Sequence, residues 1–278
     1  MKYPSDQLQE VTYAPARNAA GAAFFDIDGT LLAKPSLERR FLRELQRRGK
    51  IPARNYLHWL VETLRLAQTL RHGRRDLRAA VQANKSYLRG VRAEIPFATG
   101  GHQDSALPGS RLPEFFPAAI QRVWWHALRG DAIVLVSGTL APLAEIVQFA
   151  LQRELLWRGV ECKVSLIATQ LEIVGGRWTG RVAGAAIIGE EKALAAKEFA
   201  RARNISLARS SAYGDSSPDR SMLAAVGHAF AVNPTRRLRR IARSRGWQIL
   251  SWTHCAVHSA SEQHTWKKSL KLKREAAR

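Results

Sequence analysis

The stretch Ala22-Ala23-Phe24-Phe25-Asp26-Ile27-Asp28-Gly29-Thr30-Leu31-Leu32 runs from apolar residues straight into two aspartates. The apolar run is short and aromatic, which predicts a buried strand. Unpaired buried charge is unfavourable, so two carboxylates at the end of such a strand need a chemical reason. Ligands bind beyond the carboxyl ends of strands in open α/β sheets, and side-chain alternation predicts that Asp26 and Asp28 point to the same side. Gly29 lets the chain turn tightly after them.

The second half of the chain alternates between strand and helix patterns. Strands are predicted at 132–139, 162–168, 210–213, 228–232 and 248–252, and helices at 117–129, 142–157, 189–202 and 236–245. This rhythm predicts an α/β fold with a doubly wound, mostly parallel sheet. A hairpin is predicted within 171–182, around the turn Gly175-Gly176.

Residues 34–95 change to a helical pattern. Ser36 is the predicted N-cap of a first helix that Gly49 closes. A second helix is predicted from Asn55 to about Gly73, and a third over 75–88. The second helix has apolar residues at the spacing of a core face, namely Leu57, Leu60, Val61, Leu64 and Ala67.

The other faces of these helices carry arginines, for which two interpretations stay open. A solvated surface is the favoured one, and contact with an anionic substrate or an anionic membrane surface is the alternative. The following residues, 96–112, are rich in Gly, Pro and Ser, which predicts a loop or hinge.

Composition narrows the class of protein. The chain has 278 residues, of which 46% are hydrophobic, so it can bury a core. No apolar run reaches the roughly 20 residues that span a bilayer, and residues 1–17 lack the apolar centre of a signal peptide. With only two cysteines, a cytoplasmic protein is the simplest expectation.

The net charge of +21 favours anionic partners, which include phosphorylated metabolites, membrane surfaces and nucleic acid. Nucleic acid is the less favoured partner, because the basic run 236–245 and the C-terminal lysines lack interleaved aromatics and a recognition motif. Cys162 is expected to be a buried small hydrophobe and the Trp124-Trp125 pair to belong to the core. The cluster His254, Cys255, His258 and His264 fits no standard zinc spacing.

Further polar residues follow the predicted strand and helix ends in a fixed order. They are Ser137, then Lys192, then Asp215 with Asp219. Together with the Asp-Ile-Asp-Gly-Thr run at 26–30, this order resembles the haloacid dehalogenase superfamily, and in detail its phosphoserine-phosphatase-like subfamily IB. The resemblance covers residues 20–252. It implies a Rossmann-like core of residues 20–33 and 113–252, an inserted helical cap at 34–112, and polar or basic tails at 1–19 and 253–278.

The resemblance also implies an activity, that of a phosphomonoester hydrolase acting on a small phosphorylated metabolite. Asp26 would attack phosphorus and form an aspartyl-phosphate. Asp28 would protonate the leaving oxygen and then deprotonate the attacking water. Ser137 and the backbone N–H of Gly138 would bind the phosphate, and Lys192 would add positive charge to Asp26 and to the phosphate.

A Mg²⁺ cofactor belongs to the same implication, because Mg²⁺ suits carboxylate and phosphate oxygens. The implied ligands are Asp26, the backbone carbonyl of Asp28, and Asp215. Asp219 would lie in the outer shell and orient the ligands.

Each of these residues also has a plain structural interpretation. Ser137 could cap the next helix, Lys192 could be a solvated helix lysine, and Asp219 could be a turn or N-cap residue. Their joint occurrence with the paired aspartates favours the phosphatase site. Two alternatives stay open, a lipid-phosphate phosphatase at a membrane surface and a nucleic-acid or anionic-surface binding protein with a vestigial site.

The substrate is left open by two departures from the family pattern. Gly29 stands where phosphoserine phosphatases commonly have Ser. No acidic and basic pair that would clamp an amino-acid substrate can be placed in the helical segment, where Glu38 is the nearest acid. The oligomeric state is not predicted.

Overall fold

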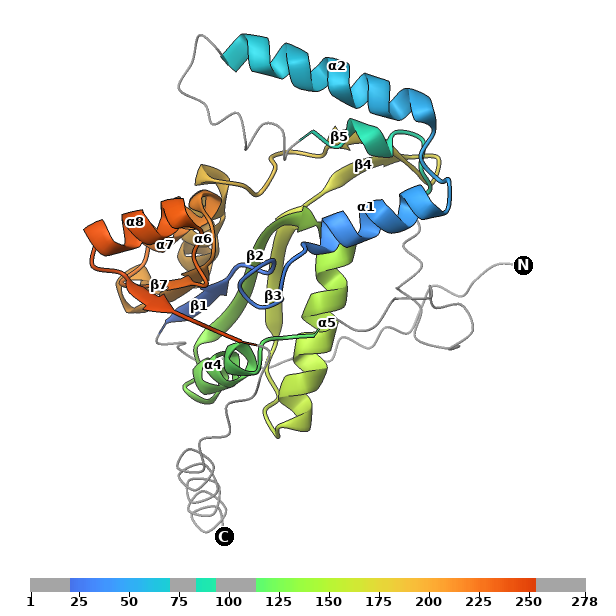
Figure 1. Ribbon diagram of the computed structural model, residues 1–278. Coiled ribbons are helices and arrows are strands. Elements are labelled where there is room, and N and C mark those ends of the chain that lie inside the picture. Colours follow the sequence, from blue (N-terminus) through green and yellow to red (C-terminus); the bar gives the residue numbers. More distant parts are fainter. Residues whose placement is uncertain (1–20, 71–83, 94–113, 254–278) are drawn as a thin grey trace.

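The computed structural model describes residues 21–70, 84–93 and 114–253. Its main sheet has six strands in the order β3-β2-β1-β6-β7-β8 (Figure 1). Every pair of neighbours in this sheet is parallel, which confirms the predicted sheet. The strands are β1 (Ala22–Phe25), β2 (Ala132–Leu140), β3 (Val164–Thr169), β6 (Ser211–Gly214), β7 (His228–Val232) and β8 (Gln248–Leu250).

Helices cover both faces of this sheet, as a doubly wound fold requires. The first face is covered by α4 (Pro117–Leu128) and α5 (Ala141–Trp157). The opposite face is covered by α6 (Glu190–Ala202), α7 (Arg220–Ala224) and α8 (Arg236–Ser244). Among the described residues, short 3-10 turns lie at η1 (Ser86–Leu88), η3 (Leu207–Arg209) and η4 (Ser217–Asp219).

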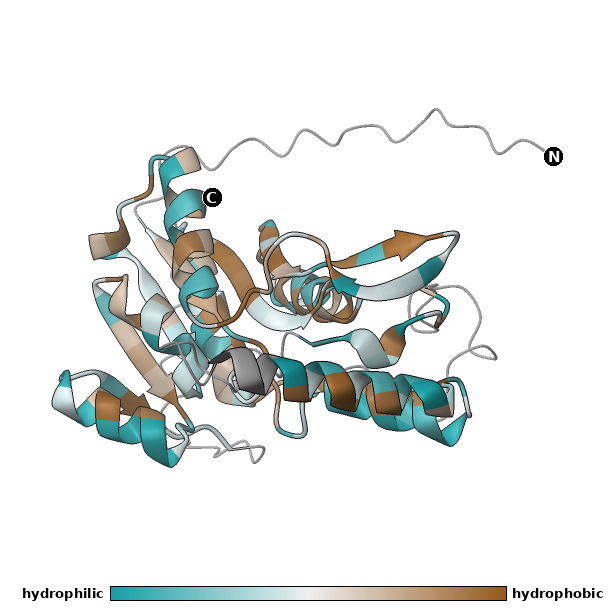
Figure 2. Cartoon of the chain, turned by 90° about the horizontal axis from the view of Figure 1, so that it is seen from above, coloured by the Kyte–Doolittle hydropathy of each residue, from teal (hydrophilic) through white to brown (hydrophobic). Residues whose placement is uncertain are grey.

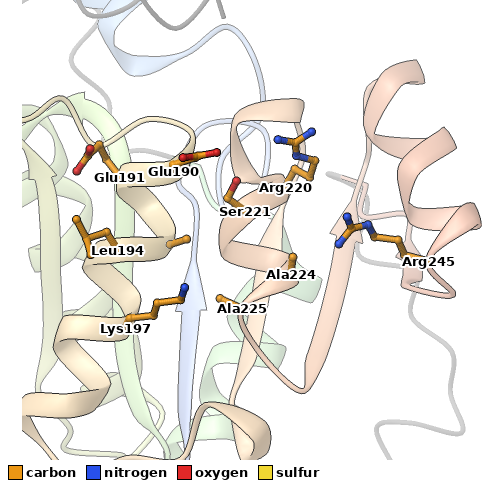
Figure 3. Close-up of a pocket in the computed structure, with 10 residues that line it drawn as sticks. Glu190, Glu191, Leu194, Lys197, Arg220, Ser221, Ala224, Ala225 and Arg245 are labelled. Carbon is orange, nitrogen blue, oxygen red and sulfur yellow. The ribbon is translucent and has the colours of Figure 1, made fainter. Parts of the chain in front are cut away.

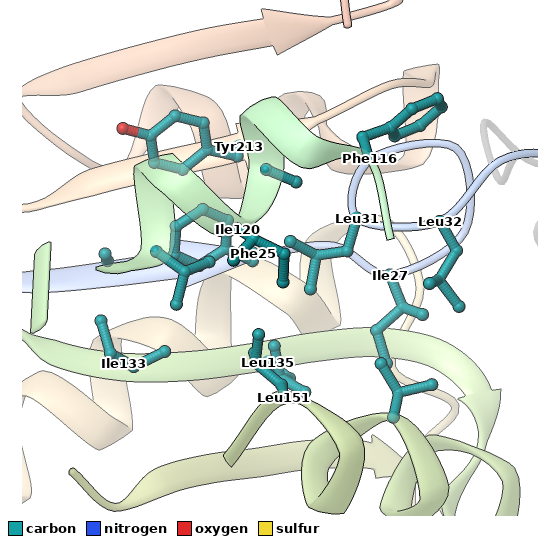
Figure 4. Packing of buried hydrophobic residues seen from close by; sticks show 14 of the residues in the cluster. Phe25, Ile27, Leu31, Leu32, Phe116, Ile120, Ile133, Leu135, Leu151 and Tyr213 are labelled. Atoms are coloured by element: carbon teal, nitrogen blue, oxygen red, sulfur yellow. The ribbon is translucent and has the colours of Figure 1, made fainter. Parts of the chain in front are cut away.

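Alternation along β1 divides its side chains between the two faces. Phe25 packs with Ile120 of α4, Leu135 of β2 and Leu151 of α5, as Figure 4 shows. Phe24 points the other way, into the cluster under α6, α7 and α8. The central strand is therefore buried on both sides, which explains why its sequence is a continuous apolar run.

A polar network that the sequence did not indicate crosses the first face. Tyr213 of β6 stacks between Phe25 and Phe230, with ring centroids 4.5 and 4.6 Å apart. Its hydroxyl lies 2.8 Å from His126 Nε2, and His126 Nδ1 lies 2.8 Å from Asp131 Oδ2. Burial lowers the pKa of His126, so the ring is neutral at pH 7 and Nδ1–H donates to the Asp131 carboxylate.

The segment after β1 forms two helices, α1 (Leu37–Arg47) and α2 (Ala53–Leu70). The Ser36 side chain accepts the backbone N–H of Arg39 at 3.3 Å, which confirms the predicted N-cap. A separate hairpin, β4 (Leu171–Val174) with β5 (Arg177–Val182), is antiparallel as predicted. Its residue Trp178 meets Phe41 of α1 edge-to-face at 5.9 Å, within a third apolar cluster. The hairpin, predicted as part of the 113–252 core segment, thus packs against the helices that follow β1.

The prediction of a core face on the second helix is wrong. Leu57, Leu60 and Leu64 are 65%, 48% and 55% exposed. Val61 is half-buried, and nothing is described of the Ala67 side chain. The helix packs instead through Trp59, which lies against the third apolar cluster, and through Asn55, whose Nδ2 donates to the carbonyl oxygens of Tyr87 and Arg89 at 3.0 and 2.7 Å. Helical spacing was predicted correctly, but spacing alone does not tell which face of a helix meets the rest of the protein.

Smaller expectations also change. Cys162 precedes β3 and is half-buried rather than buried in a strand, and burial raises the pKa of its thiol to about 11. Trp125 is exposed on α4, with the Arg129 guanidinium 4.4 Å from its ring centroid. Of the predicted third helix, residues 84–88 are described, and among them Ser86–Leu88 form a 3-10 turn. Its other residues, the hinge at 96–112, the tails, and His254, Cys255, His258 and His264 lie outside the described residues.

None of the helices that the structure describes is long and apolar enough to cross a membrane.

The fold predicts that two leucine-to-alanine substitutions lower the free energy of unfolding by very different amounts. Leu135 is fully buried against β1 and α5, so Leu135→Ala should lower the free energy of unfolding by about 2–5 kcal/mol, through lost transfer energy and the cavity it leaves. Leu156 on α5 is exposed, so the control Leu156→Ala should change that energy by less than about 0.5 kcal/mol. Urea unfolding monitored by circular dichroism measures both, and similar losses would contradict the described core.

Candidate active site

The strand order brings two acidic loops together. From β1 the chain passes to β2 and β3 on one side, then returns to β6 on the other side of β1. Asp26 directly follows β1 and Asp215 directly follows β6. The backbone N–H of Asp26 donates to the carbonyl oxygen of Tyr213 at 3.0 Å, which holds the two loops side by side. This reversal of strand order is where α/β sheets bind ligands.

Lys192 links these loops to α6. Its Nζ lies 2.6 Å from Asp26 Oδ1 and 2.6 Å from Asp219 Oδ1, and the side chain is buried. The position is in the first turn of α6, as predicted. Burial alone would lower the pKa of Lys192, but the charges of Asp219 and Asp26 outweigh it and raise the pKa. The ammonium therefore stays charged, and it is not a solvated helix lysine.

Asp219 fixes the shape of the loop that carries Asp215. Its Oδ2 accepts the backbone N–H groups of Asp215 and Ser216 at 3.1 and 2.9 Å, and the Ser216 hydroxyl at 3.1 Å. Its other oxygen is taken by Lys192. The residue is thus a turn aspartate and a neighbour of the acidic cluster at once, so its two interpretations do not exclude each other.

Asp28 is hydrogen-bonded by two groups other than Lys192. Its Oδ1 accepts the backbone N–H of Leu37, the first residue of α1, at 2.8 Å, and its Oδ2 accepts the Thr139 hydroxyl. Burial raises the pKa of the Asp28 carboxyl, against the lowering effect of these two hydrogen bonds. Asp28 therefore keeps its proton to a higher pH than a solvated aspartate does.

Thr139 is the partner that sequence reasoning missed. Its signal was the run Ser137-Gly138-Thr139 at the end of a predicted strand, in which only the first two residues were assigned a role.

Both Asp26 and Asp28 follow β1 rather than lying within it, so strand alternation is not what orients them.

Ser137 is buried near the carboxyl end of β2, and its Oγ accepts the Thr139 N–H at 3.2 Å. It does not cap the next helix, because α5 has Leu140 as its N-cap residue. At Gly138 an added Cβ would lie 2.9 Å from Ile188 Cγ1, so a side chain at this position would force Ile188 to shift. Both residues lie on β2, which the structure places next to β1.

Three carboxylates form a compact buried group. Asp26, Asp215 and Asp219 each offer an oxygen, and these oxygens lie within 4.8 Å of one another. Burial, together with the neighbouring carboxylates, raises the pKa of both Asp26 and Asp215, so a cation among them would stabilise their charged forms. An oxygen-lined group of this kind fits a hard divalent cation.

Lys34 partly supplies that charge in the structure. Its Nζ lies 2.6 Å from Asp215 Oδ2, a buried oxygen with no well-oriented hydrogen bond in the part of the chain that the structure covers. The Lys34 side chain is 60% exposed, so it can leave Asp215 without any rearrangement of the core.

Glu38, the nearest acid on α1, is already paired. Its Oε1 accepts both the buried Lys85 ammonium and the Tyr87 hydroxyl. Burial, followed by the Glu38 charge, raises the pKa of Tyr87, so the phenol stays protonated and donates. The negative charge of Glu38 is therefore balanced inside the protein rather than free for a ligand.

A surface pocket of about 650 Å³ lies between α6 and α7, and the residues that line it include Glu191, Lys197, Arg220 and, at the end of α8, Arg245 (Figure 3). None of the clustered aspartates lines this pocket. The pocket and the acidic cluster are therefore separate features of the molecule.

Comparisons with known proteins agree with this arrangement. Residues 23–224 match the haloacid dehalogenase-like hydrolase family. The chain is 31% identical to phosphoserine phosphatase SerB1 of Mycobacterium tuberculosis over 84% of this chain and 72% of that protein. It is 30% identical to a probable phosphatase of the same organism, over 86% of this chain and 77% of the relative.

Solved structures give the same fold. A Bordetella pertussis protein of unknown function has a TM-score of 0.56 and 26% identity, over 84% of this chain and 99% of that chain. A phosphoserine phosphatase, solved as an analogue of its phospho-aspartyl intermediate, has a TM-score of 0.51 over 84% of this chain and 94% of that chain. At 18% identity, this second likeness concerns the fold alone.

The site predicts an unequal effect of two glycine substitutions. Gly29 has φ +91°, and an added Cβ would lie 2.5 Å from Asp215 Oδ2. Gly49 has φ +60° and open space around the same position. Both Gly→Ala changes strain the backbone, but only Gly29→Ala adds a clash, so it should lower the free energy of unfolding by about 1–2 kcal/mol more than Gly49→Ala. Urea unfolding measures the difference, and equal losses would show that the two loops do not touch.

Proposed function

The chain belongs to the haloacid dehalogenase-like hydrolase family and is a phosphatase of that family, and we propose that it hydrolyses small phosphomonoesters with Mg²⁺ through a phosphorylated Asp26. One observation carries this proposal. Asp26, Asp215 and Lys192 meet in a buried cluster at the carboxyl ends of adjacent strands, with Asp28 two residues from the nucleophile.

Asp26 is the proposed nucleophile. Lys192 holds its Oδ1, whereas Oδ2 has only a 3.3 Å contact with the Thr30 hydroxyl among the described side chains. In the first step a carboxylate oxygen of Asp26 bonds to phosphorus while the bond from phosphorus to the ester oxygen breaks. The Lys192 ammonium would offset the negative charge that the phosphoryl group brings beside Asp26.

Asp28 is the proposed acid and base. It gives its proton to the departing ester oxygen, which leaves as an alcohol. A water then attacks phosphorus and loses a proton to Asp28, so inorganic phosphate is released and Asp26 is restored. The hydrogen bonds from Leu37 and Thr139 support this role, because they fix the carboxyl without neutralising it.

Ser137 and the backbone N–H of Gly138 are proposed to bind the phosphate oxygens. Their place on β2, next to β1, supports this assignment. Asp26, Asp215 and the backbone carbonyl of Asp28 would hold Mg²⁺, which supplies charge neutralisation of the phosphoryl oxygens and in-line alignment. Asp219 would orient these ligands through its bonds to Lys192 and to the Asp215 loop. Lys34 would then move away from Asp215, since its side chain is exposed and has room to move.

Residues 34–112 are proposed to form a cap over this site, with residues 20–33 and 113–252 as the core. The shared apolar cluster of α1, η1 and the hairpin supports a single cap unit that also includes the hairpin. One relative is named a phosphoserine phosphatase, but we do not extend that substrate to this chain. Glu38, the acid placed to receive an ammonium group, is already bound by Lys85 and Tyr87.

The proposal predicts a metal-dependent activity that one atom replacement removes. Asp26→Asn should lower kcat for phosphate release by about 10³-fold or more, because the amide is a poor nucleophile. EDTA should abolish the wild-type rate and Mg²⁺ should restore it. Phosphate release from a panel of sugar phosphates, nucleotides, phosphoserine and lysophosphatidate measures both effects. The control Glu198→Gln, an exposed carboxylate on α6, should leave the rate unchanged, and a fully active Asp26→Asn variant would refute the mechanism.

A second prediction separates Asp28 from Asp26. In Asp28→Asn, kcat/KM for an alkyl phosphate should fall about 10²- to 10⁴-fold, because an alkoxide needs a proton to leave. For p-nitrophenyl phosphate the loss should be much smaller, since p-nitrophenolate leaves without one. In the wild type, kcat/KM for the alkyl phosphate should fall as pH rises through the raised pKa of Asp28, because the acid form is then lost. Equal losses for both substrates would assign the proton to another group.

A further inference from the structure

The α2 helix is fixed on one side by Asn55 and Trp59 and exposes a row of leucines on the other. Asn55 donates to two carbonyl oxygens near η1, and Asn84 Nδ2 donates to the Trp59 carbonyl oxygen and the Thr63 hydroxyl at 3.3 and 3.1 Å. Leu57, Leu60 and Leu64 therefore lie on the opposite, exposed side. Figure 2 marks apolar residues along α2 as brown bands between teal ones.

We call this row the leucine stripe (Leu57, Leu60 and Leu64). Its members are spaced by three and four residues, so they form one continuous face on consecutive turns. In the part of the chain that the structure covers, all three side chains are exposed. A continuous exposed apolar face on a protein surface marks a site of interaction.

Basic residues flank the leucine stripe. Arg54 and Arg65 are exposed on α2, near the two ends of the stripe. Among the α2 side chains that the structure describes, Glu62 is the one acid, and its carboxylate lies 3.3 Å from His58. Leucines beside unmatched arginines are the composition of helices that lie flat in the headgroup region of an anionic bilayer.

The end of the sheet that bears the acidic cluster is also basic. The backbone N–H of Thr235 donates to the Asp215 carbonyl oxygen at 2.9 Å, and α8 starts there with the exposed pair Arg236 and Arg237. Exposed arginines also cover α1, at positions 39, 40, 43 and 47. In Figure 1, α1 and α2 lie on the side of the molecule to which β1 leads. A surface of one charge sign attracts a surface of the other.

A second apolar patch, on α5, lacks this charge. Phe149, Leu156 and Trp157 are exposed there. Arg158 lies 2.8 Å from Glu154, and the charge of Arg153 is matched on the same helix by Glu145. The α5 patch therefore has no surplus of positive charge for an anionic partner.

We propose that the leucine stripe docks α2 onto an anionic lipid bilayer, with Arg54 and Arg65 at the level of the headgroups. The leucines supply burial in the acyl boundary, and the arginines supply attraction to anionic lipids. This docking stands apart from the phosphatase reaction. It brings the cap to the surface where membrane-borne phosphomonoesters lie, and that consequence alone rests on the proposed function.

Co-sedimentation of the full chain with lipid vesicles tests the docking without any substrate. The chain should bind vesicles that contain phosphatidylglycerol and bind weakly to vesicles of phosphatidylcholine alone. Binding should fall as salt rises from low to physiological strength, since the charge contribution is screened over about 10 Å. Replacing all three stripe leucines by serine should weaken binding about tenfold to a hundredfold, and Arg54→Glu with Arg65→Glu should reduce the preference for phosphatidylglycerol.

A matched variant carries serine at Phe149, Leu156 and Trp157 of α5 and should bind vesicles as the wild type does. Loss of binding in this variant but not in the stripe variant would overturn the proposal. So would no vesicle binding by the wild type, or a dimer in light scattering that the stripe variant dissociates, or a salt-dependent affinity for RNA in place of vesicles. Hydrolysis of p-nitrophenyl phosphate should be the same in the stripe variant and the wild type, which separates a failed docking from a failed phosphatase.

Discussion

The Lys192 ammonium joins three parts of the chain that are far apart in the sequence. It bonds to Asp26 after β1 and to Asp219 before α7, and it comes from the first turn of α6. Three buried groups of opposite charge hold one another in place, and none of them would be stable there alone. The position of α6 on the sheet and the shape of the Asp215 loop both depend on this contact, because Asp219 bonds to that loop with its other oxygen.

The buried cluster has more carboxylates than cations, and this imbalance gives the site its character. The sheet gathers Asp26 and Asp215 by placing β6 beside β1, and burial then makes their charged forms unfavourable. Lys34 reaches in from the exposed start of the cap segment and pairs with Asp215. A site of this kind attracts cations by its own electrostatics, before any substrate arrives.

Much of this arrangement could be predicted because it depends on neighbours in sequence. The apolar run before Asp26, the βα rhythm after residue 113 and the N-cap at Ser36 are local patterns, and the structure confirms them. The contacts of Thr139 with Asp28 and of Lys85 with Glu38 join residues 111 and 47 positions apart, which no local pattern reveals. The structure shows that the site residues come together, whereas their roles in the reaction stay predictions. The leucine stripe shows a different limit, since an apolar face has the same spacing whether it packs inward or outward.

The bond between Asp28 and the first N–H of α1 joins the acid to the helical segment that follows it. This bond helps to orient the Asp28 carboxyl, so the carboxyl is correctly oriented only while α1 keeps its position. A shift of the helix would therefore also move the proton that Asp28 donates. Because Asp28 is the proposed acid, a compound that binds while α1 is out of its place would stay bound without being cleaved. Discrimination between compounds would then appear in turnover more than in affinity, and accidental hydrolysis of abundant phosphate esters would be suppressed at the chemical step.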